Sequence, residues 1–272
     1  MTDRYAVVGN PVAHSRSPEI HAMFARECGA DMQYERLLAP ATEFAATVDA
    51  FRINGASGAN VTLPFKLEAF DYADARTARA ERGRSVNTLR FDANEIVGDN
   101  TDGVGLCRDI VSNIGQPLLG ARILLVGAGG AARAVIGALL DFQPATLVIT
   151  NRTPDKAQAI VDEFNARNVF YAIGYSALPT QRFDVLINAT SASLTASLPL
   201  VPVSCFEQNA LAYDMMYGKG QTPFLALAAS AGARTADGLG MLVEQAAEAF
   251  FVWRGVRPAT GSVLKSMRQS TR

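Results

Sequence analysis

Short apolar runs alternate with amphipathic segments along the first part of the chain. Tyr5–Val8 is an apolar run that predicts a buried strand, and Ser17-Pro18 then predicts a helix start with Ser17 as the N-cap. Apolar residues at helical spacing follow, and Cys28-Gly29 favours the helix end. A strand over 33–38, a helix over 43–53 and a strand over 58–62 continue the alternation. Alternating strands and helices predict a parallel sheet.

The pattern changes between residues 69 and 114. Helical spacing predicts one helix over 69–82, and two short runs over 87–91 and 95–98 predict a β-hairpin. Thr101-Asp102-Gly103 then begins a helix that we expect to continue to Ile114. We expect the first domain to end near the start of this helix.

The second half of the chain begins with a βαβ pattern. Apolar strands over 122–126 and 146–150 flank a glycine-rich turn and a helix over 131–140, the length that a βαβ unit needs. Further strands are expected over 185–189 and 211–215, and helices over 223–231 and 241–254. The pattern therefore predicts an α/β fold with a Rossmann-type domain in this half.

The glycine-rich turn has the spacing of a dinucleotide site. It has a GxGxxA pattern, and we expect its small residues to let the backbone approach a pyrophosphate at the helix N-terminus. A tight turn without a ligand is the alternative. The candidate cofactor residues here are Gly127, Ala128, Gly129, Gly130 and Ala131.

The following strand ends in a basic and amide-bearing segment. An NAD site would usually place a carboxylate at this point to bind the ribose 2′-hydroxyl, but the chain has Asn151-Arg152-Thr153. The Arg152 guanidinium can clamp a 2′-phosphate, Asn151 and Thr153 can donate to the same group, and Lys156 adds charge. The sequence therefore predicts NADP over NAD, with a solvated surface arginine as the other interpretation of Arg152.

Composition narrows the function classes. The 272 residues suit two domains, and 49% hydrophobic and 19% charged residues with a net charge of −1 are typical of a folded protein without a nucleic-acid-binding face. Three spaced cysteines and two histidines supply no metal-ligand spacing and no Ser-His-Asp triad, so we expect free thiols and no metal. The apolar run at the N-terminus is too short for a signal or a membrane span, which favours the cytoplasm.

Two charged residues are candidates for chemistry. Lys66 follows Pro64-Phe65 at the end of a predicted strand, and Asp102 lies at a predicted helix start. Taken alone, each residue is more often a solvated charge or a helix N-cap than a catalytic group. Many neutral hydroxyl and amide side chains accompany them, which suits a small ligand with several hydroxyls and a carboxylate.

Five ordered segments together resemble the shikimate dehydrogenase family. They are Gly9–Pro18, Asn60–Lys66, Asn100–Gly103, Asn151–Thr153 and Gly238–Ala246, and they extend over nearly the whole chain. The resemblance implies reversible reduction of 3-dehydroshikimate to shikimate with NADP, a step of aromatic amino-acid biosynthesis. It also implies an N-terminal α/β substrate domain with a mostly parallel sheet, formed by residues 1–102 and 238–272. Residues 103–237 would form the Rossmann domain, with the active-site cleft between the two.

The resemblance also assigns roles to single residues. Lys66 and Asp102 match the family's proton-transfer pair. Ser15 and Ser17 would bind the substrate carboxylate, while Asn60, Thr62, Asn87, Asp102 and Gln245 would hold the ring hydroxyls, with Tyr217 nearby. Thr190, Met215 and Gly238 would join the cofactor site. Alone, Ser17 could be only an N-cap, Asn60 and Asn87 only turn residues, and Gln245 only a helix-surface residue.

Two segments depart from the family pattern. Residues 192–195 lack an expected glycine-containing run, and Ser85 stands where the family more often has alanine. Neither departure touches Lys66 or Asp102. A quinate/shikimate dehydrogenase of relaxed specificity and a non-catalytic sensor that binds the same ligand are the alternatives. We expect a small-molecule substrate, no nucleic acid and no membrane, and either a monomer or a homodimer.

Overall fold

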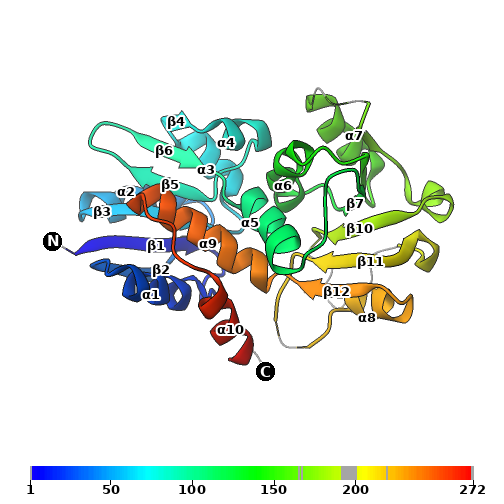
Figure 1. Ribbon diagram of the computed structural model, residues 1–272. Coiled ribbons are helices and arrows are strands. Elements are labelled where there is room, and N and C mark those ends of the chain that lie inside the picture. Colours follow the sequence, from blue (N-terminus) through cyan, green and yellow to red (C-terminus); the bar gives the residue numbers. More distant parts are fainter. Residues whose placement is uncertain (1, 165, 167, 191–200, 219, 271–272) are drawn as a thin grey trace. The chain divides into compact units, whose positions relative to one another are not determined.

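The computed structural model describes residues 2–164, 166, 168–190, 201–218 and 220–270. The chain folds into two compact units, each with its own six-stranded sheet (Figure 1). Unit 1 contains the residues up to Gly105 together with Leu242–Ser270, and unit 2 contains Leu106–Met241. The expected α/β fold with two parallel-rich sheets is confirmed.

The sheet of unit 1 has the strand order β2-β1-β3-β5-β6-β4. The pairs β1–β2, β1–β3 and β4–β6 are parallel, and β3–β5 is antiparallel. The pair β5–β6 is also antiparallel, because a hairpin joins its strands. The strands are β1 (Asp3–Gly9), β2 (Met32–Leu38), β3 (Ala56–Val61), β4 (Ala75–Arg76), β5 (Thr88–Phe91) and β6 (Ile96–Asp99).

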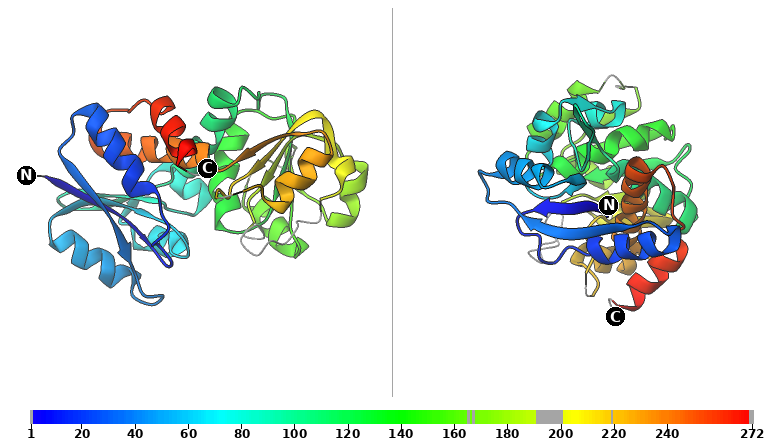
Figure 2. Two further views of the ribbon diagram at one scale, coloured as in Figure 1. Left: turned by 90° about the horizontal axis from the view of Figure 1, so that it is seen from below. Right: turned by 90° about the vertical axis from the view of Figure 1, so that its left-hand side faces the viewer.

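Helices cover both faces of this sheet. The helices are α1 (Ser17–Cys28), α2 (Phe44–Ile53), α3 (Lys66–Tyr72), α4 (Ala78–Gly83), α9 (Leu239–Arg254) and α10 (Gly261–Gln269). On one face the Tyr5 ring stacks on Trp253 of α9 at 4.5 Å, and α10 lies against α1 (Figure 2). On the other face Phe44 and Phe65 pack with Val8 and Val61 in a separate core.

Two sequence predictions for unit 1 are wrong. The single helix expected over 69–82 is α3 and α4 separated by β4, because Asp74 accepts a hydrogen bond from the Ile96 amide at 2.8 Å and draws the chain into the sheet. Thr77 then caps α4. Ser17 is the first residue of α1 and not its N-cap, which is Arg16. The helix expected to reach Ile114 is confirmed as α5 (Asp102–Arg108), which continues into a π-helical turn, Asp109–Asn113, with Ile114 as its C-cap.

Unit 2 is a parallel sheet with the order β12-β11-β10-β7-β8-β9. This order is that of a doubly wound dinucleotide-binding sheet, whose order reverses between β10 and β7. The strands are β7 (Arg122–Val126), β8 (Thr146–Thr150), β9 (Phe170–Ala172), β10 (Phe183–Asn188), β11 (Phe206–Asp214) and β12 (Arg234–Asp237). The expected βαβ unit is confirmed by β7, α6 (Gly130–Asp141) and β8.

Alternate residues of these strands build two cores. Ile123 and Leu125 face a core shared with α6, α7 (Pro154–Glu163) and the end of α5. Leu124 and Val126 face the opposite core, shared with α8 (Pro223–Ser230), which Figure 2 shows on one side of the sheet. Because both faces are buried, the strands are continuous apolar runs, and the glycine-rich turn is fixed at the carboxyl end of β7.

Candidate functional site

Lys66 and Asp102 form a short ion pair in unit 1. Lys66 is the first residue of α3 and Asp102 the first residue of α5, and the distance from Lys66 Nζ to Asp102 Oδ2 is 2.5 Å. The side chains are 22% and 8% exposed, so the carboxylate is buried while the amine keeps an exposed part. The second carboxylate oxygen, Oδ1, accepts a hydrogen bond from Asn87 Nδ2 at 2.9 Å. The first residues of two helices thus hold an acid and an amine together.

Asn87 is the centre of a buried polar cluster. Its Oδ1 accepts from the Thr101 amide at 2.8 Å, and its Nδ2 donates to Thr101 Oγ1 at 3.0 Å. Gln245, on α9, lies within 3.4 Å of the same Asn87 nitrogen through its Oε1. The structure therefore joins Asn87, Asp102 and Gln245, and adds Thr101, which sequence reasoning missed although it lies inside the Asn-Thr-Asp-Gly segment.

Asn60 extends the cluster along β3. Its Nδ2 donates to the Asn87 carbonyl at 3.2 Å and to Thr88 Oγ1 at 3.0 Å. Its Oδ1 accepts from the Tyr34 hydroxyl at 2.7 Å. Thr62 follows directly after β3 and is partly exposed. Tyr34 is a second residue that the sequence analysis did not assign to the site.

Ser15 and Ser17 lie together at the start of α1. Their hydroxyl oxygens are 3.2 Å apart, and the Ser17 amide donates to Ser15 Oγ at 3.3 Å. The Ser15 carbonyl accepts two hydrogen bonds from Arg36, at 2.8 and 2.6 Å. Ser15 therefore accepts a hydrogen bond from one of the backbone amides that have no partner within the first turn of α1.

A buried ion network supports the Asn87 cluster. Arg79 donates to both oxygens of Asp99 at 2.6 Å and to Glu248 of α9 at 2.8 Å. Burial alone would raise the pKa of Asp99, but the hydrogen bonds and charge of Arg79 outweigh it and hold that pKa below its ordinary value. Asp99 also accepts from the Asn100 amide at 2.7 Å, in the segment that leads to Asp102. No sequence signal pointed to Arg79.

The glycine-rich turn of unit 2 leaves backbone groups open. A Cβ added at Gly129 or Gly130 would meet no heavy atom within 4 Å, and the α6 N-terminus has no side-chain cap at Gly129. Its free N–H groups and this open space fit a pyrophosphate. Gly127 has φ +112°, and an added Cβ would lie 3.0 Å from the Thr190 methyl, so only glycine suits this position. Ala128 and Ala131 are partly exposed.

The segment after β8 exposes the expected basic side chains. Arg152, Thr153 and Lys156 are exposed, and Asn151 Nδ2 donates to the Thr153 carbonyl at 2.9 Å. Burial raises the pKa of Tyr175, and the positive charge of Arg152 opposes that shift. An exposed arginine at this strand end fits a 2′-phosphate.

The other expected cofactor residues surround the same sheet edge. Thr190 donates through its hydroxyl to Asn188 Oδ1 at 2.7 Å and lies against Gly127. Gly238 packs on the backbone of Met215, where an added Cβ would lie 2.6 Å from the carbonyl carbon. Tyr217 lies in the segment after β11 and is partly exposed. Residues 192–195 lie outside the described residues.

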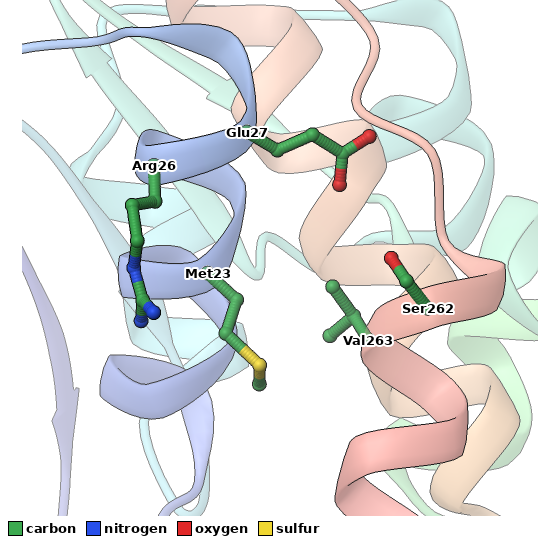
Figure 3. Close-up of a pocket in the computed structure, with 5 residues that line it drawn as sticks. All are labelled: Met23, Arg26, Glu27, Ser262 and Val263. Carbon is green, nitrogen blue, oxygen red and sulfur yellow. The ribbon is translucent and has the colours of Figure 1, made fainter.

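Other features of the described residues carry no such chemistry. A shallow pocket lined by Met23, Arg26, Glu27, Ser262 and Val263 lies between α1 and α10 and contains none of the expected site residues (Figure 3). No group of three or more His, Cys, Asp or Glu side chains is placed to hold a metal ion within this part of the chain. Within the same residues, no helix has the length and apolar character that crossing a membrane requires.

The three cysteines are free thiols, as expected, and they differ in burial. Cys107 and Cys205 are buried free thiols, and burial raises their pKa to about 12 and about 11. Cys28 is a free thiol too, but it is partly exposed at the end of α1.

Three family models match the chain. Residues 7–89 match the shikimate dehydrogenase substrate binding domain, residues 109–200 match shikimate / quinate 5-dehydrogenase, and residues 238–268 match the shikimate 5′-dehydrogenase C-terminal domain. Between them they contain Lys66, the glycine-rich turn and Gln245. The order of the three matches follows the order of the segments in the chain.

Relatives of full length support the same family. The chain is 56% identical over 271 residues to the shikimate dehydrogenase (NADP(+)) of Nitrosospira multiformis, covering 99% of this chain and 98% of that protein. Among solved structures, an Ael1 enzyme from Pseudomonas putida is 48% identical with a TM-score of 0.92, covering 97% of each chain. The shikimate 5-dehydrogenase of Thermus thermophilus, solved with NADP(H) and shikimate, is 32% identical with a TM-score of 0.88, covering 98% and 99%.

Proposed function

Because the chain belongs to the shikimate dehydrogenase family, we propose that it catalyses the reversible NADP-dependent reduction of 3-dehydroshikimate to shikimate. The observation that carries this proposal is the 2.5 Å contact between Lys66 Nζ and Asp102 Oδ2 at the edge of a buried polar cluster. The reaction needs one hydride and one proton. When bound, NADPH supplies the hydride to the carbonyl carbon.

Lys66 supplies the proton. Its ammonium donates to the substrate carbonyl oxygen as that oxygen gains negative charge, and in the reverse direction the neutral amine accepts the proton of the hydroxyl. Asp102 holds the Lys66 amine in place through Oδ2, while Asn87 fixes the carboxylate through Oδ1. The amine therefore has one partner that orients it and one exposed side that faces a ligand.

The neutral side chains of unit 1 bind the rest of the substrate. Ser15 and Ser17 donate to the carboxylate, and Asn60, Thr62, Asn87 and Gln245 hold the ring hydroxyls, with Tyr217 contributed by unit 2. Their support is the continuous set of hydrogen bonds that joins Asn60, Asn87 and Gln245. The side chains of a preformed cluster lose little conformational entropy when they bind a small polar ring.

The residues of unit 2 bind NADP. The backbone of Gly127–Ala131 receives the pyrophosphate, and Arg152 receives the 2′-phosphate with Asn151, Thr153 and Lys156 beside it. Thr190, Met215 and Gly238 line the other side of the same strand ends. Open space before Gly129 and Gly130 and the exposed Arg152 guanidinium support this assignment.

The test is a spectrophotometric assay of NADPH formation with shikimate. The wild-type chain should reduce NADP only when shikimate is present, and Lys66→Ala should lower kcat by about 10² to 10⁴, the usual contribution of a general acid–base group. Lys265→Ala removes an exposed lysine of α10 and serves as the control. A Lys66→Ala kcat within about tenfold of the wild type would reject the role of Lys66.

A second candidate is a quinate/shikimate dehydrogenase. The observation that favours quinate as a substrate is the match of residues 109–200 to a model described as shikimate / quinate 5-dehydrogenase. Comparing kcat/KM for the two acids in the same assay separates the candidates. Faster turnover of quinate would favour the second.

A further inference from the structure

Tyr34 contacts Asn60 from a strand that carries no expected site residue. Tyr34 lies in the middle of β2, and its hydroxyl donates to Asn60 Oδ1 at 2.7 Å. Burial raises the pKa of Tyr34, and hydrogen bonding to Ser17 opposes that shift. The same phenol therefore interacts with Asn60 and Ser17, which the proposed function assigns to different groups of the substrate.

The direction of these hydrogen bonds is fixed by chemistry. The Asn87 backbone carbonyl can only accept, so the side-chain nitrogen of Asn60 must face it at 3.2 Å. The same nitrogen donates its other hydrogen to Thr88 Oγ1 at 3.0 Å. Asn60 Oδ1 is then left to accept, and the Tyr34 hydroxyl must donate to it. Both amide hydrogens of Asn60 are used, so Asn60 offers a ligand only the remaining lone pair of Oδ1.

The Tyr34 ring is itself held by aromatic packing. It stacks on His21 with 4.2 Å between ring centres and 9° between planes, and His21 is fully buried among Phe24, Phe250 and Trp253. Neither ring nitrogen of His21 makes a hydrogen bond of normal geometry among the described residues, although the ring interacts with the Asn60 side chain. A buried imidazole without such hydrogen bonds costs folding free energy, so its flat ring must contribute through packing.

We propose that Tyr34 is a positioning residue for substrate binding. Its hydroxyl locks the Asn60 amide so that Oδ1 presents its free lone pair to a ring hydroxyl of the substrate, and His21 holds the Tyr34 ring in the required plane. This inference rests on the proposed function and deepens it. It implies that the group bound by Asn60 is a hydrogen-bond donor, as a hydroxyl is and a keto oxygen is not.

The test combines one conservative variant with a matched control in the full chain. Tyr34→Phe removes only the hydroxyl and should raise KM for shikimate about tenfold, with kcat and KM for NADP within about twofold. Tyr72→Phe removes a hydroxyl that donates to Asp49 Oδ1 at 2.8 Å and should leave all three constants unchanged. Equal shikimate KM values for Tyr34→Phe and Tyr72→Phe would overturn the proposal.

A double-mutant cycle shows whether Tyr34 acts through Asn60. In an Asn60→Ala background, adding Tyr34→Phe should change KM for shikimate by less than about twofold. A full tenfold rise in that background would overturn the proposal, because Tyr34 would then act independently of Asn60. His21→Leu, which removes the stacked ring but keeps the phenol, should raise the same KM by a smaller factor. An unchanged KM would contradict the role of His21, even if Tyr34→Phe fails to fold.

The proposed function and this inference fail in different ways. If the wild-type chain does not reduce NADP with shikimate, the proposed function fails before any variant is made. If the wild type is active and Tyr34→Phe behaves as Tyr72→Phe does, only the inference fails.

Discussion

The two candidate sites of this chain are built in opposite ways. The polar cluster of unit 1 consists of buried side chains that already hydrogen-bond to one another, as Asn87 does with Thr101, Asp102 and Gln245. The glycine-rich turn of unit 2 consists of open backbone, with Gly129 and Gly130 facing empty space and Arg152 exposed beyond it. One site is preformed from side chains, and the other is a cradle that a ligand must complete.

This difference predicts different responses to substitution. A side chain removed from the unit 1 cluster leaves buried partners unsatisfied, so folding stability and substrate binding should both suffer. A substitution in the unit 2 cradle meets few neighbours, so binding should suffer while stability is kept.

Arg79→Met should cause the largest loss of stability. It leaves the buried Asp99 carboxylate without a cation, whereas Glu248 keeps its pair with Arg257, and breaking a buried pair costs about 3–5 kcal/mol. Arg90→Met is the control, because the Arg90–Asp92 pair is about 40% exposed on both sides and should cost at most about 1 kcal/mol. Urea denaturation measures both. Equal losses in the free energy of unfolding for the two variants would show that the buried network adds nothing to folding stability.

The loss of folding stability in Arg79→Met should also depend on pH. Arg79 depresses the pKa of Asp99 in the folded protein, so the pair stabilises the fold above the unfolded pKa of Asp99 and loses that effect as pH falls through the folded pKa. The stability difference between wild type and Arg79→Met should therefore be largest near neutral pH and shrink in acid. A difference that stays constant from about pH 7 to about pH 3 would contradict this coupling.

Gly238→Ala and Gly129→Ala form a matched pair in unit 2. At Gly238 the new methyl would collide with the Met215 carbonyl, so we expect a loss of about 1–3 kcal/mol in the free energy of unfolding. At Gly129 nothing lies within 4 Å, so the melting temperature should hold while KM for NADP rises. An unchanged KM at Gly129→Ala would argue against a pyrophosphate in this cradle.

Arg152→Ala should change cofactor preference and little else. We expect kcat/KM with NADP to fall about tenfold, equivalent to about 1.4 kcal/mol, with kcat/KM for NAD unchanged. Arg52→Ala, at another exposed arginine, is the control. If NADP preference survives in Arg152→Ala, another group binds the 2′-phosphate.

Ser85→Ala should have the smallest effect on folding stability, and this effect should be stabilising. The Ser85 hydroxyl is buried and has no hydrogen-bond partner among the described residues, so its removal should stabilise the fold by about 1 kcal/mol. Thr77→Val removes a hydroxyl that donates to Asp99 at 2.6 Å and should destabilise it. Thermal unfolding of both variants tests this, and a destabilised Ser85→Ala would reveal a missed partner.

The same contrast explains what the sequence could predict. The unit 2 turn is local, since β7, its glycines and α6 follow one another in the chain, and its GxGxxA spacing is therefore readable. The boundaries of β7 and β8 were predicted correctly for the same reason. The family resemblance supplied the residues of the unit 1 cluster, whereas their spacing alone left Lys66 and Asp102 ambiguous.

The errors and omissions come from contacts that are distant in sequence. The break between α3 and α4 depends on Asp74 meeting the Ile96 amide, which no helical periodicity records. Tyr34 lies in a run that predicted a strand correctly, but its meeting with Asn60 requires the register of β2, β1 and β3. Arg79 reaches Glu248 across 169 positions of sequence. Such contacts follow from the tertiary fold and leave no local pattern.

A crystal structure of the chain with NADP and shikimate bound would test the claim that the Lys66 amine, held by Asp102, exchanges the proton of the reacting hydroxyl. We predict Lys66 Nζ within about 2.6–3.2 Å of that oxygen, with Asp102 still in contact. Lys66 pointing into bulk solvent while shikimate occupies a site elsewhere would contradict the claim.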